Sequence, residues 1–133
     1  MPQRSELQKL LVGLRVLVVD DDPDARDLLN SVLAYCGALV TLVPSARAGL
    51  AATRTIAPDV IVVAVDLAGE DGFWLVRELR GSSGSVAIPV IAVADDREGG
   101  PERTLTAGFD AYLRKPVDPW DLCRIVAEVA RKP

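Results

Sequence analysis

Five short apolar runs, separated by segments with helical periodicity, constrain this 133-residue chain more than any other feature. The runs cover 15–19, 39–43, 60–65, 90–94 and 111–113. Most of them are apolar on both faces, which is typical of strands buried inside a parallel sheet. Strands that alternate with helices predict an α/β fold, in which right-handed crossovers place helices on both faces of the sheet.

Start and stop signals place helices between these runs. Asp22 followed by Pro23 is a typical helix start, because an aspartate side chain caps free backbone amides and proline fits the first helical position. Gly37 is a typical stop. Further helices are expected over 45–55, over 72–80, in a short segment that ends near 108, and from 118 or 119 onward. A flexible turn is expected over 81–85, and a mobile polar stretch over 95–101.

Composition narrows the classes of function. The chain has no histidine, which excludes histidine-based catalysis and metal ligation by imidazole. Its 15 basic and 19 acidic residues give a net charge of −4, which argues against binding of nucleic acid by this domain. No apolar run reaches the ~18 residues of a membrane span, so we expect no membrane partner and a cytoplasmic location. Two cysteines, Cys36 and Cys123, make neither a disulfide framework nor a zinc site, and we expect buried thiols.

The first residues precede the repeating pattern. We divide the chain into an N-terminal leader, residues 1–13, and a single domain, residues 14–133. Part of the leader could form an amphipathic turn, because Leu7, Leu10 and Leu11 recur at helical spacing. A disordered or loosely packed leader is the favoured interpretation.

Charged residues follow the strands at one edge of the predicted sheet. Asp20 and Asp21 come directly after the first strand, and Lys115 follows the fifth. Open parallel sheets bind their ligands beyond the carboxyl ends of the strands, so these side chains are candidates for one shared site. Two adjacent carboxylates suit a hard cation such as Mg²⁺. The alternative is that the aspartates only cap the next helix and that Lys115 is a solvated surface lysine.

Longer motifs carry a specific resemblance. Five segments take part: VLVVDDDPDAR (16–26), PDVIVV (58–63), GEDGFWLVRELR (69–80), IPVIAV (88–93) and AGFDAYLRKPVDPWDL (107–122). In this order and spacing the chain resembles the receiver domains of two-component response regulators, the CheY-like family. The resemblance implies a flavodoxin-like (βα)5 fold, a doubly wound parallel sheet with strand order 2-1-3-4-5. It also implies a Mg²⁺-dependent site where a histidine kinase transfers a phosphoryl group to an aspartate.

The resemblance assigns roles to individual residues. The acid pair of the family maps to Asp20 and Asp21, and the lysine that contacts the phosphoryl group maps to Lys115, whose bond to the next proline is usually cis. The aromatic switch position maps to Tyr112. The Ser or Thr that bonds the phosphoryl group maps to Ala94, which has no hydroxyl.

The acceptor position is the main departure from the family. The acceptor aspartate lies six residues after the proline of the Pro-Asp motif and eight before the glycine of the Asp-Gly motif, and both counts end at Ala64. A methyl group cannot attack phosphorus, so the usual position cannot be phosphorylated. The loss of one carboxylate is expected to weaken Mg²⁺ binding. Asp66 could be a metal ligand or a displaced acceptor, because strand alternation places it on the face of Ala64. A solvent-facing loop aspartate is the favoured alternative.

Two interpretations of function follow. In the first, the chain is a receiver that signals by protein contact and is not phosphorylated at Ala64. In the second, it is a phospho-accepting receiver whose acceptor was mutated to Ala64 or replaced by Asp66. An unrelated flavodoxin-like enzyme is disfavoured, because no cofactor motif is present, and we expect no enzyme activity. The expected partners are a histidine kinase or another signalling protein, and a second copy through the face of the last helix, where Trp120 could be an anchor.

Overall fold

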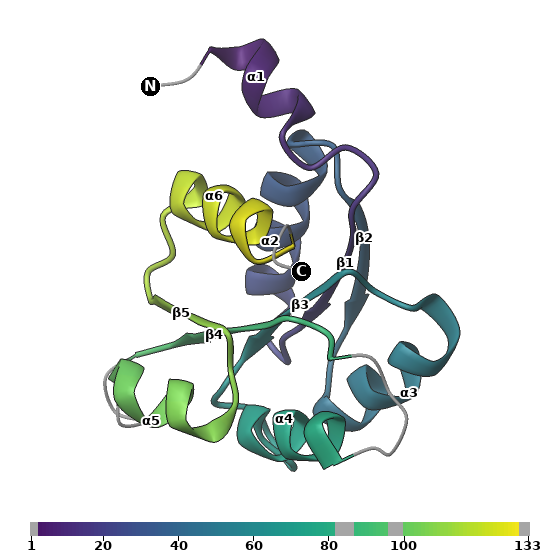
Figure 1. Cartoon of the computed structure of the whole chain (residues 1–133), viewed down its shortest axis with the longest axis vertical. Helices are drawn as coiled ribbons and strands as arrows, with labels where there is room; N and C mark the ends of the chain where they lie inside the picture. Colours follow the sequence, from purple (N-terminus) through teal and green to yellow (C-terminus); the bar gives the residue numbers. More distant parts are fainter. Residues whose placement is uncertain (1–2, 82–86, 96–99, 131–133) are drawn as a thin grey trace.

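A five-stranded parallel sheet forms the centre of the molecule (Figure 1). The computed structural model describes residues 3–81, 87–95 and 100–130. The strands are β1 (Arg15–Val19), β2 (Leu39–Val43), β3 (Val60–Ala64), β4 (Val90–Ala94) and β5 (Ala111–Arg114). Their order in the sheet is β2-β1-β3-β4-β5, so the predicted 2-1-3-4-5 topology is confirmed.

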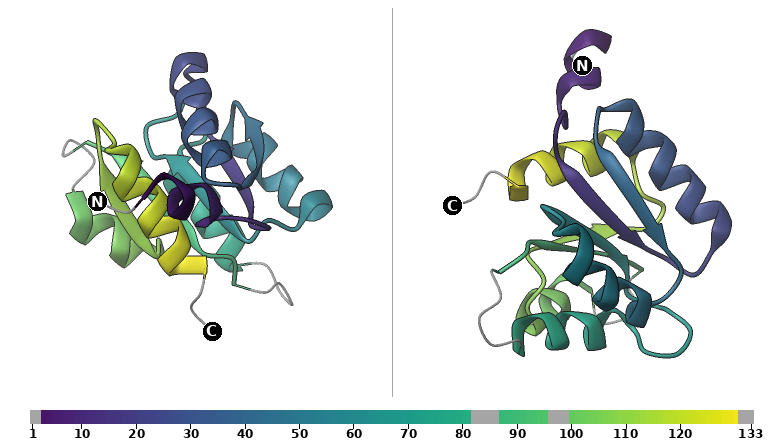
Figure 2. Two further views of the ribbon diagram at one scale, coloured as in Figure 1. Left: turned by 90° about the horizontal axis from the view of Figure 1, so that it is seen from above. Right: turned by 90° about the vertical axis from the view of Figure 1, so that its right-hand side faces the viewer.

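Helices cover both faces of this sheet (Figures 1 and 2). One face is covered by α2 (Pro23–Tyr35) and α6 (Pro119–Ala130). The other is covered by α3 (Ala46–Ile56), α4 (Gly72–Gly81) and α5 (Gly100–Ala107). An additional short helix, α1 (Arg4–Lys9), projects from the end of the molecule at which β1 begins (Figure 2).

The core consists of two apolar layers, one on each face of the sheet. Side chains alternate along β1: Val16 and Val18 pack toward α2 and α6, whereas Leu17 and Val19 pack toward α3 and α4. Every residue of β3 and β4 is buried. This double burial explains why the sequence shows continuous apolar runs at these strands rather than an alternation of apolar and polar residues.

The segment before β1 corrects one expectation. Leu11 has no exposed surface, and its backbone amide donates to the carbonyl of Cys36 at 2.9 Å. Three residues later, the Leu14 carbonyl accepts from the amide of Leu39 at 2.8 Å. The favoured interpretation of a disordered or loosely packed leader is therefore wrong here. The apolar residues of this segment form only a short pattern in the sequence. Leu11 becomes buried because the tertiary fold places the end of α2 against it.

Local signals fix the loops at the carboxyl ends of β1 and β3. The side chain of Asp22 accepts from the amide of Asp24 at 3.1 Å, so the predicted cap of α2 is confirmed. Gly72 begins α4 where the chain passes very close to the preceding loop. A Cβ atom there would lie 3.0 Å from the Cα of Val65 and 3.2 Å from the carbonyl oxygen of Ala64. Only glycine fits this approach without displacement of backbone.

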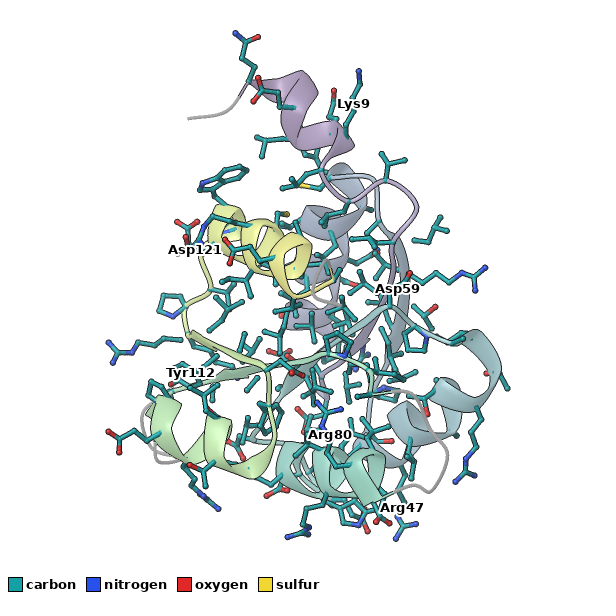
Figure 3. The ribbon with its side chains drawn as sticks, viewed as in Figure 1. Lys9, Arg47, Asp59, Arg80, Tyr112 and Asp121 are labelled. Atoms are coloured by element: carbon teal, nitrogen blue, oxygen red, sulfur yellow. The ribbon has the colours of Figure 1, made fainter. Side chains whose placement is uncertain are left out.

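Arg80 joins α4 to the segments that precede β4 and β5, at the amino ends of the strands (Figure 3). Its guanidinium donates to the carbonyl of Gly108 through two nitrogens and to the carbonyl of Ile88 at 2.8 Å. It also forms an ion pair with Asp110 at 2.8 Å, and the same carboxylate oxygen accepts from the amide of Val90 at 2.8 Å. One side chain thus connects α4 with the start of β4 and the loop before β5.

Two expected loops fall mostly outside the described residues. These are the flexible turn over 81–85 and the mobile stretch over 95–101. Within the described part, Gly81 closes α4, and Gly100 and Pro101 lie in α5.

Candidate functional site

The residues singled out by the sequence meet at the carboxyl edge of the sheet. Parallel register aligns the last pairs of neighbouring strands, which are Val19 with Val63, Ala64 with Val93, and Ala94 with Arg114. The amide of Lys115 donates to the carbonyl of Ala94 at 2.9 Å, which continues the ladder beyond β5. The ends of β1, β3, β4 and β5 therefore face one region, as expected for a doubly wound sheet.

Asp20 is the most deeply placed acid of this region, with 3% of its surface exposed. Its Oδ1 accepts from the amide of Asp22 at 3.0 Å, and its carbonyl accepts from the guanidinium of Arg26 at 2.8 Å. Burial raises the pKa of the Asp20 carboxyl, and this effect outweighs the opposing influence of the Asp22 amide and of the positive charge on Lys115.

Asp21 is exposed and has a different environment from its neighbour. Its Oδ2 accepts from the amide of Ala68 at 2.9 Å, so this carboxylate ties the loop after β1 to the loop after β3. Asp66 lies in that second loop and is exposed, whereas Ala64 is buried. Because β3 ends at Ala64, strand alternation does not extend to position 66, and the exposure of Asp66 agrees with the favoured alternative of a solvent-facing loop aspartate.

A cavity of about 520 Å³ opens beside Asp20. Its charged lining consists of Asp20, Asp22, Asp95 and the exposed Lys115, and the remainder is apolar. Lys115 is joined to the next proline by a cis peptide bond, as the resemblance implied. The cavity thus combines one ammonium group with three carboxyl groups, one of which is buried.

Two buried alanines end β3 and β4, at the positions to which the resemblance assigns the acceptor and the Ser or Thr. Ala64 and Ala94 are 3% and 1% exposed and belong to the apolar layer beneath α3, α4 and α5. The hydroxyl of Tyr112, on β5, donates to the carbonyl of Ala94 over a long 3.4 Å (Figure 3). A main-chain oxygen is thus a partner of this tyrosine at the end of β4.

The remaining donors fit Mg²⁺ only in part. Mg²⁺ needs near-octahedral oxygen ligands. Asp20 and Asp21 offer carboxylates, although one oxygen of Asp21 already accepts from the backbone of the β3–α4 loop. Ala64 offers none. Within residues 3–81, 87–95 and 100–130, no three Asp, Glu, Cys or His side chains form a group that could hold a metal ion.

Three residues contribute to the site without a role in it having been predicted from the sequence. Arg26 lies one helical turn after Asp22, and this spacing could have indicated that it reaches back to the loop after β1. Asp22 was assigned only to the helix cap, yet it also lines the cavity. Asp95 directly follows β4, and the strand-end argument points to it, but no role in the site was assigned to it.

Comparisons with known proteins agree with this arrangement. Residues 16–127 match the family model described as response regulator receiver domain. A 14.6 kDa protein of Leptolyngbya boryana, described as uncharacterized and encoded in the sodA1 3′ region, is 40% identical over 119 residues, which are 89% of this chain and 91% of that protein. Protein PilH of Pseudomonas aeruginosa is 33% identical over 116 residues, covering 86% of this chain and 96% of PilH.

A solved structure supports the same relationship. The receiver domain of the sensor histidine kinase PA1611 from Pseudomonas aeruginosa superposes with a TM-score of 0.82 at 27% identity, and covers 91% of this chain and all of that domain. That structure has a magnesium ion coordinated in its active site cleft. In the described part of the present chain, no helix is both long and apolar enough to cross a membrane.

Proposed function

The chain belongs to the response regulator receiver domain family, and we propose that it signals by protein contact without accepting a phosphoryl group at position 64. The buried methyl group of Ala64 carries this proposal. Phosphoryl transfer to a receiver needs an oxygen nucleophile at the end of β3, and an alkyl carbon has no lone pair with which to attack phosphorus.

The second alanine supports the same proposal. The family resemblance implies that a hydroxyl at position 94 bonds a phosphoryl oxygen and couples phosphorylation to the switch aromatic. Ala94 cannot make that bond, and Tyr112 instead donates to the main-chain oxygen of residue 94. The carbonyl oxygen of residue 94 can accept this hydrogen bond with or without a phosphoryl group nearby. We therefore propose that the orientation of the Tyr112 side chain is not coupled to phosphorylation.

The electrostatics of the site support a metal-independent state. With no carboxylate at position 64, Asp20 and Asp21 have one fewer negative neighbour to repel them. Lys115 supplies a positive charge that acts on Asp20. We therefore propose that Mg²⁺ binds weakly and that the folded site does not require it.

The partners follow from this mode of signalling. A histidine kinase or another signalling protein is the proposed partner, recognised through surface contacts, and a second copy could bind through the face of α6 that carries Trp120. We propose a cytoplasmic location, no enzymatic turnover, and no contact of this domain with nucleic acid or membrane.

The test is incubation of the folded chain with Mg²⁺ and acetyl phosphate, followed by intact mass measurement. We expect the mass of the wild-type chain to stay unchanged. Ala64→Asp tests whether the remaining residues of the pocket are competent, and Ala64→Asn is its matched control, since it has the same size but no nucleophilic carboxylate. Uptake by the Asp variant but not by the Asn variant would assign the missing chemistry to one oxygen atom.

A second outcome separates the alternative function. If the wild-type chain gains the mass of one phosphoryl group, and Asp66→Ala abolishes that gain, the loop aspartate is a displaced acceptor and our proposal fails. A gain that persists in Asp66→Ala would place the acceptor elsewhere, and would contradict the mapping of the site as well.

A further inference from the structure

Two thiols lie against each other between α2 and α6, away from the acidic cavity. Cys36 caps the end of α2, and Cys123 is in the second turn of α6, 87 residues later. Their Sγ atoms are 2.9 Å apart, and the two residues are 3% and 1% exposed. The site assigned above involves neither of them.

This separation is short for two thiols that do not react. A disulfide bond is about 2.05 Å long, so a movement of roughly 0.9 Å would bring the sulfur atoms to bonding distance. The two cysteines come from different helices, and both helices pack on the same face of the sheet. The two thiols are therefore brought together by the packing of α2 and α6 and not by their spacing in the sequence.

The thiols are buried but not sealed. A groove of about 410 Å³ is lined by both cysteines together with Leu7, Ser31, Val32, Tyr35, Pro119 and Trp120. A small uncharged oxidant can enter such an apolar groove at little cost, whereas a charged one would lose part of its hydration. The chemistry of the site thus favours uncharged hydrogen peroxide over a charged disulfide as its oxidant.

We propose that Cys36 and Cys123 form an intramolecular disulfide when the folded protein is exposed to hydrogen peroxide. One thiol loses its proton and attacks a peroxide oxygen, so that a sulfenic acid and hydroxide form. The second thiol attacks the sulfenic sulfur, the S–O bond breaks, and water leaves. In sum, two thiols are oxidised to one disulfide and one hydrogen peroxide is reduced to two molecules of water.

The environment sets the pace of this reaction. Burial raises the pKa of the Cys123 thiol above its usual range, and the hydrogen bond with Cys36 adds to the effect. The thiolate is the nucleophile, so oxidation is slower than at an exposed, activated cysteine. The disulfide is therefore a response to sustained peroxide rather than to traces of it.

The experiment uses the full wild-type chain, first reduced and then exposed to hydrogen peroxide over a series of times. Remaining thiols are blocked with N-ethylmaleimide, and intact mass and a non-reducing tryptic map are recorded. We expect the loss of two hydrogen atoms, no blocked thiol, and a linked pair of the tryptic peptides 27–47 and 115–124. Dithiothreitol should restore two reactive thiols.

Single variants provide the matched control. Cys36→Ser and Cys123→Ser each retain one thiol and should yield no linked peptide within one chain. The proposal is overturned if the wild-type chain keeps two blockable thiols after prolonged exposure. It is equally overturned if oxygen adds to the sulfur atoms without linkage, or if the disulfides that form join two chains instead of one.

Discussion

Replacement of Leu11 by alanine tests whether the segment before β1 belongs to the folded core. The Leu11 side chain has no exposed surface and packs in the layer formed with α2 and α6. The backbone hydrogen bond from its amide to Cys36 would be retained by alanine. The substitution therefore removes side-chain packing and leaves the local backbone contacts in place.

The expected cost follows from this complete burial. Leucine-to-alanine changes at fully buried positions lower the free energy of unfolding by roughly 3–5 kcal/mol. The variant buries less apolar surface on folding, and a cavity remains where the side chain was. Domains of this size have total stabilities of about 7–20 kcal/mol. With an m-value of about 2 kcal/mol/M, a loss of about 3 kcal/mol lowers the urea midpoint by roughly 1.5 M.

The assay is urea unfolding followed by circular dichroism, with Val12→Ala as the matched control. Val12 is the next residue along the chain and is 67% exposed, so its truncation should change the free energy of unfolding by less than about 0.5 kcal/mol. Equal midpoints for the two variants would show that the side chain of Leu11 adds no packing energy, and would support a loosely packed leader instead.

Three further outcomes are expected. Gly72→Ala should destabilise the fold by about 1–3 kcal/mol in thermal unfolding, because the new Cβ would lie 3.0 Å and 3.2 Å from backbone atoms, which would have to shift; an unchanged midpoint would contradict the close approach. Arg80→Ala should lower the free energy of unfolding by about 1–3 kcal/mol in urea, since the carboxylate of Asp110 and the carbonyl of Gly108 lose a charged donor. An unchanged free energy of unfolding would contradict the bridging role of Arg80. In calorimetric titrations, Ala64→Asp should bind Mg²⁺ about 10–100-fold more tightly than the wild-type chain, and equal affinities would count against the missing-ligand argument.

The sequence was informative wherever one short pattern decides a structure. The runs at β1 and β3 are apolar on both faces, and only strands inside a covered sheet are buried in that way. The cap at Asp22 depends on a hydrogen bond two residues away, so it can be read locally. The family motifs then supplied the strand order, which periodicity alone does not determine.

Local sequence patterns could not predict the contacts between segments that are far apart in the chain. Leu11 is buried because the end of α2 happens to pack against it, and nothing within residues 1–13 encodes that neighbour. The proximity of Cys36 and Cys123 depends on how α2 and α6 pack across the sheet. Strand alternation could not place the side chain of Asp66, because alternation applies only while the backbone stays extended, and β3 ends two residues earlier.

The two methyl groups at positions 64 and 94 have a consequence for how information could travel through this molecule. Reversible phosphorylation lets one protein molecule switch between two signalling states. If the site cannot be phosphorylated, as we propose, the signal of the reduced protein depends on its abundance and location, and these change at the rates of synthesis, dilution and proteolysis. Control would then act through the amount of the protein rather than through transfer of a phosphoryl group.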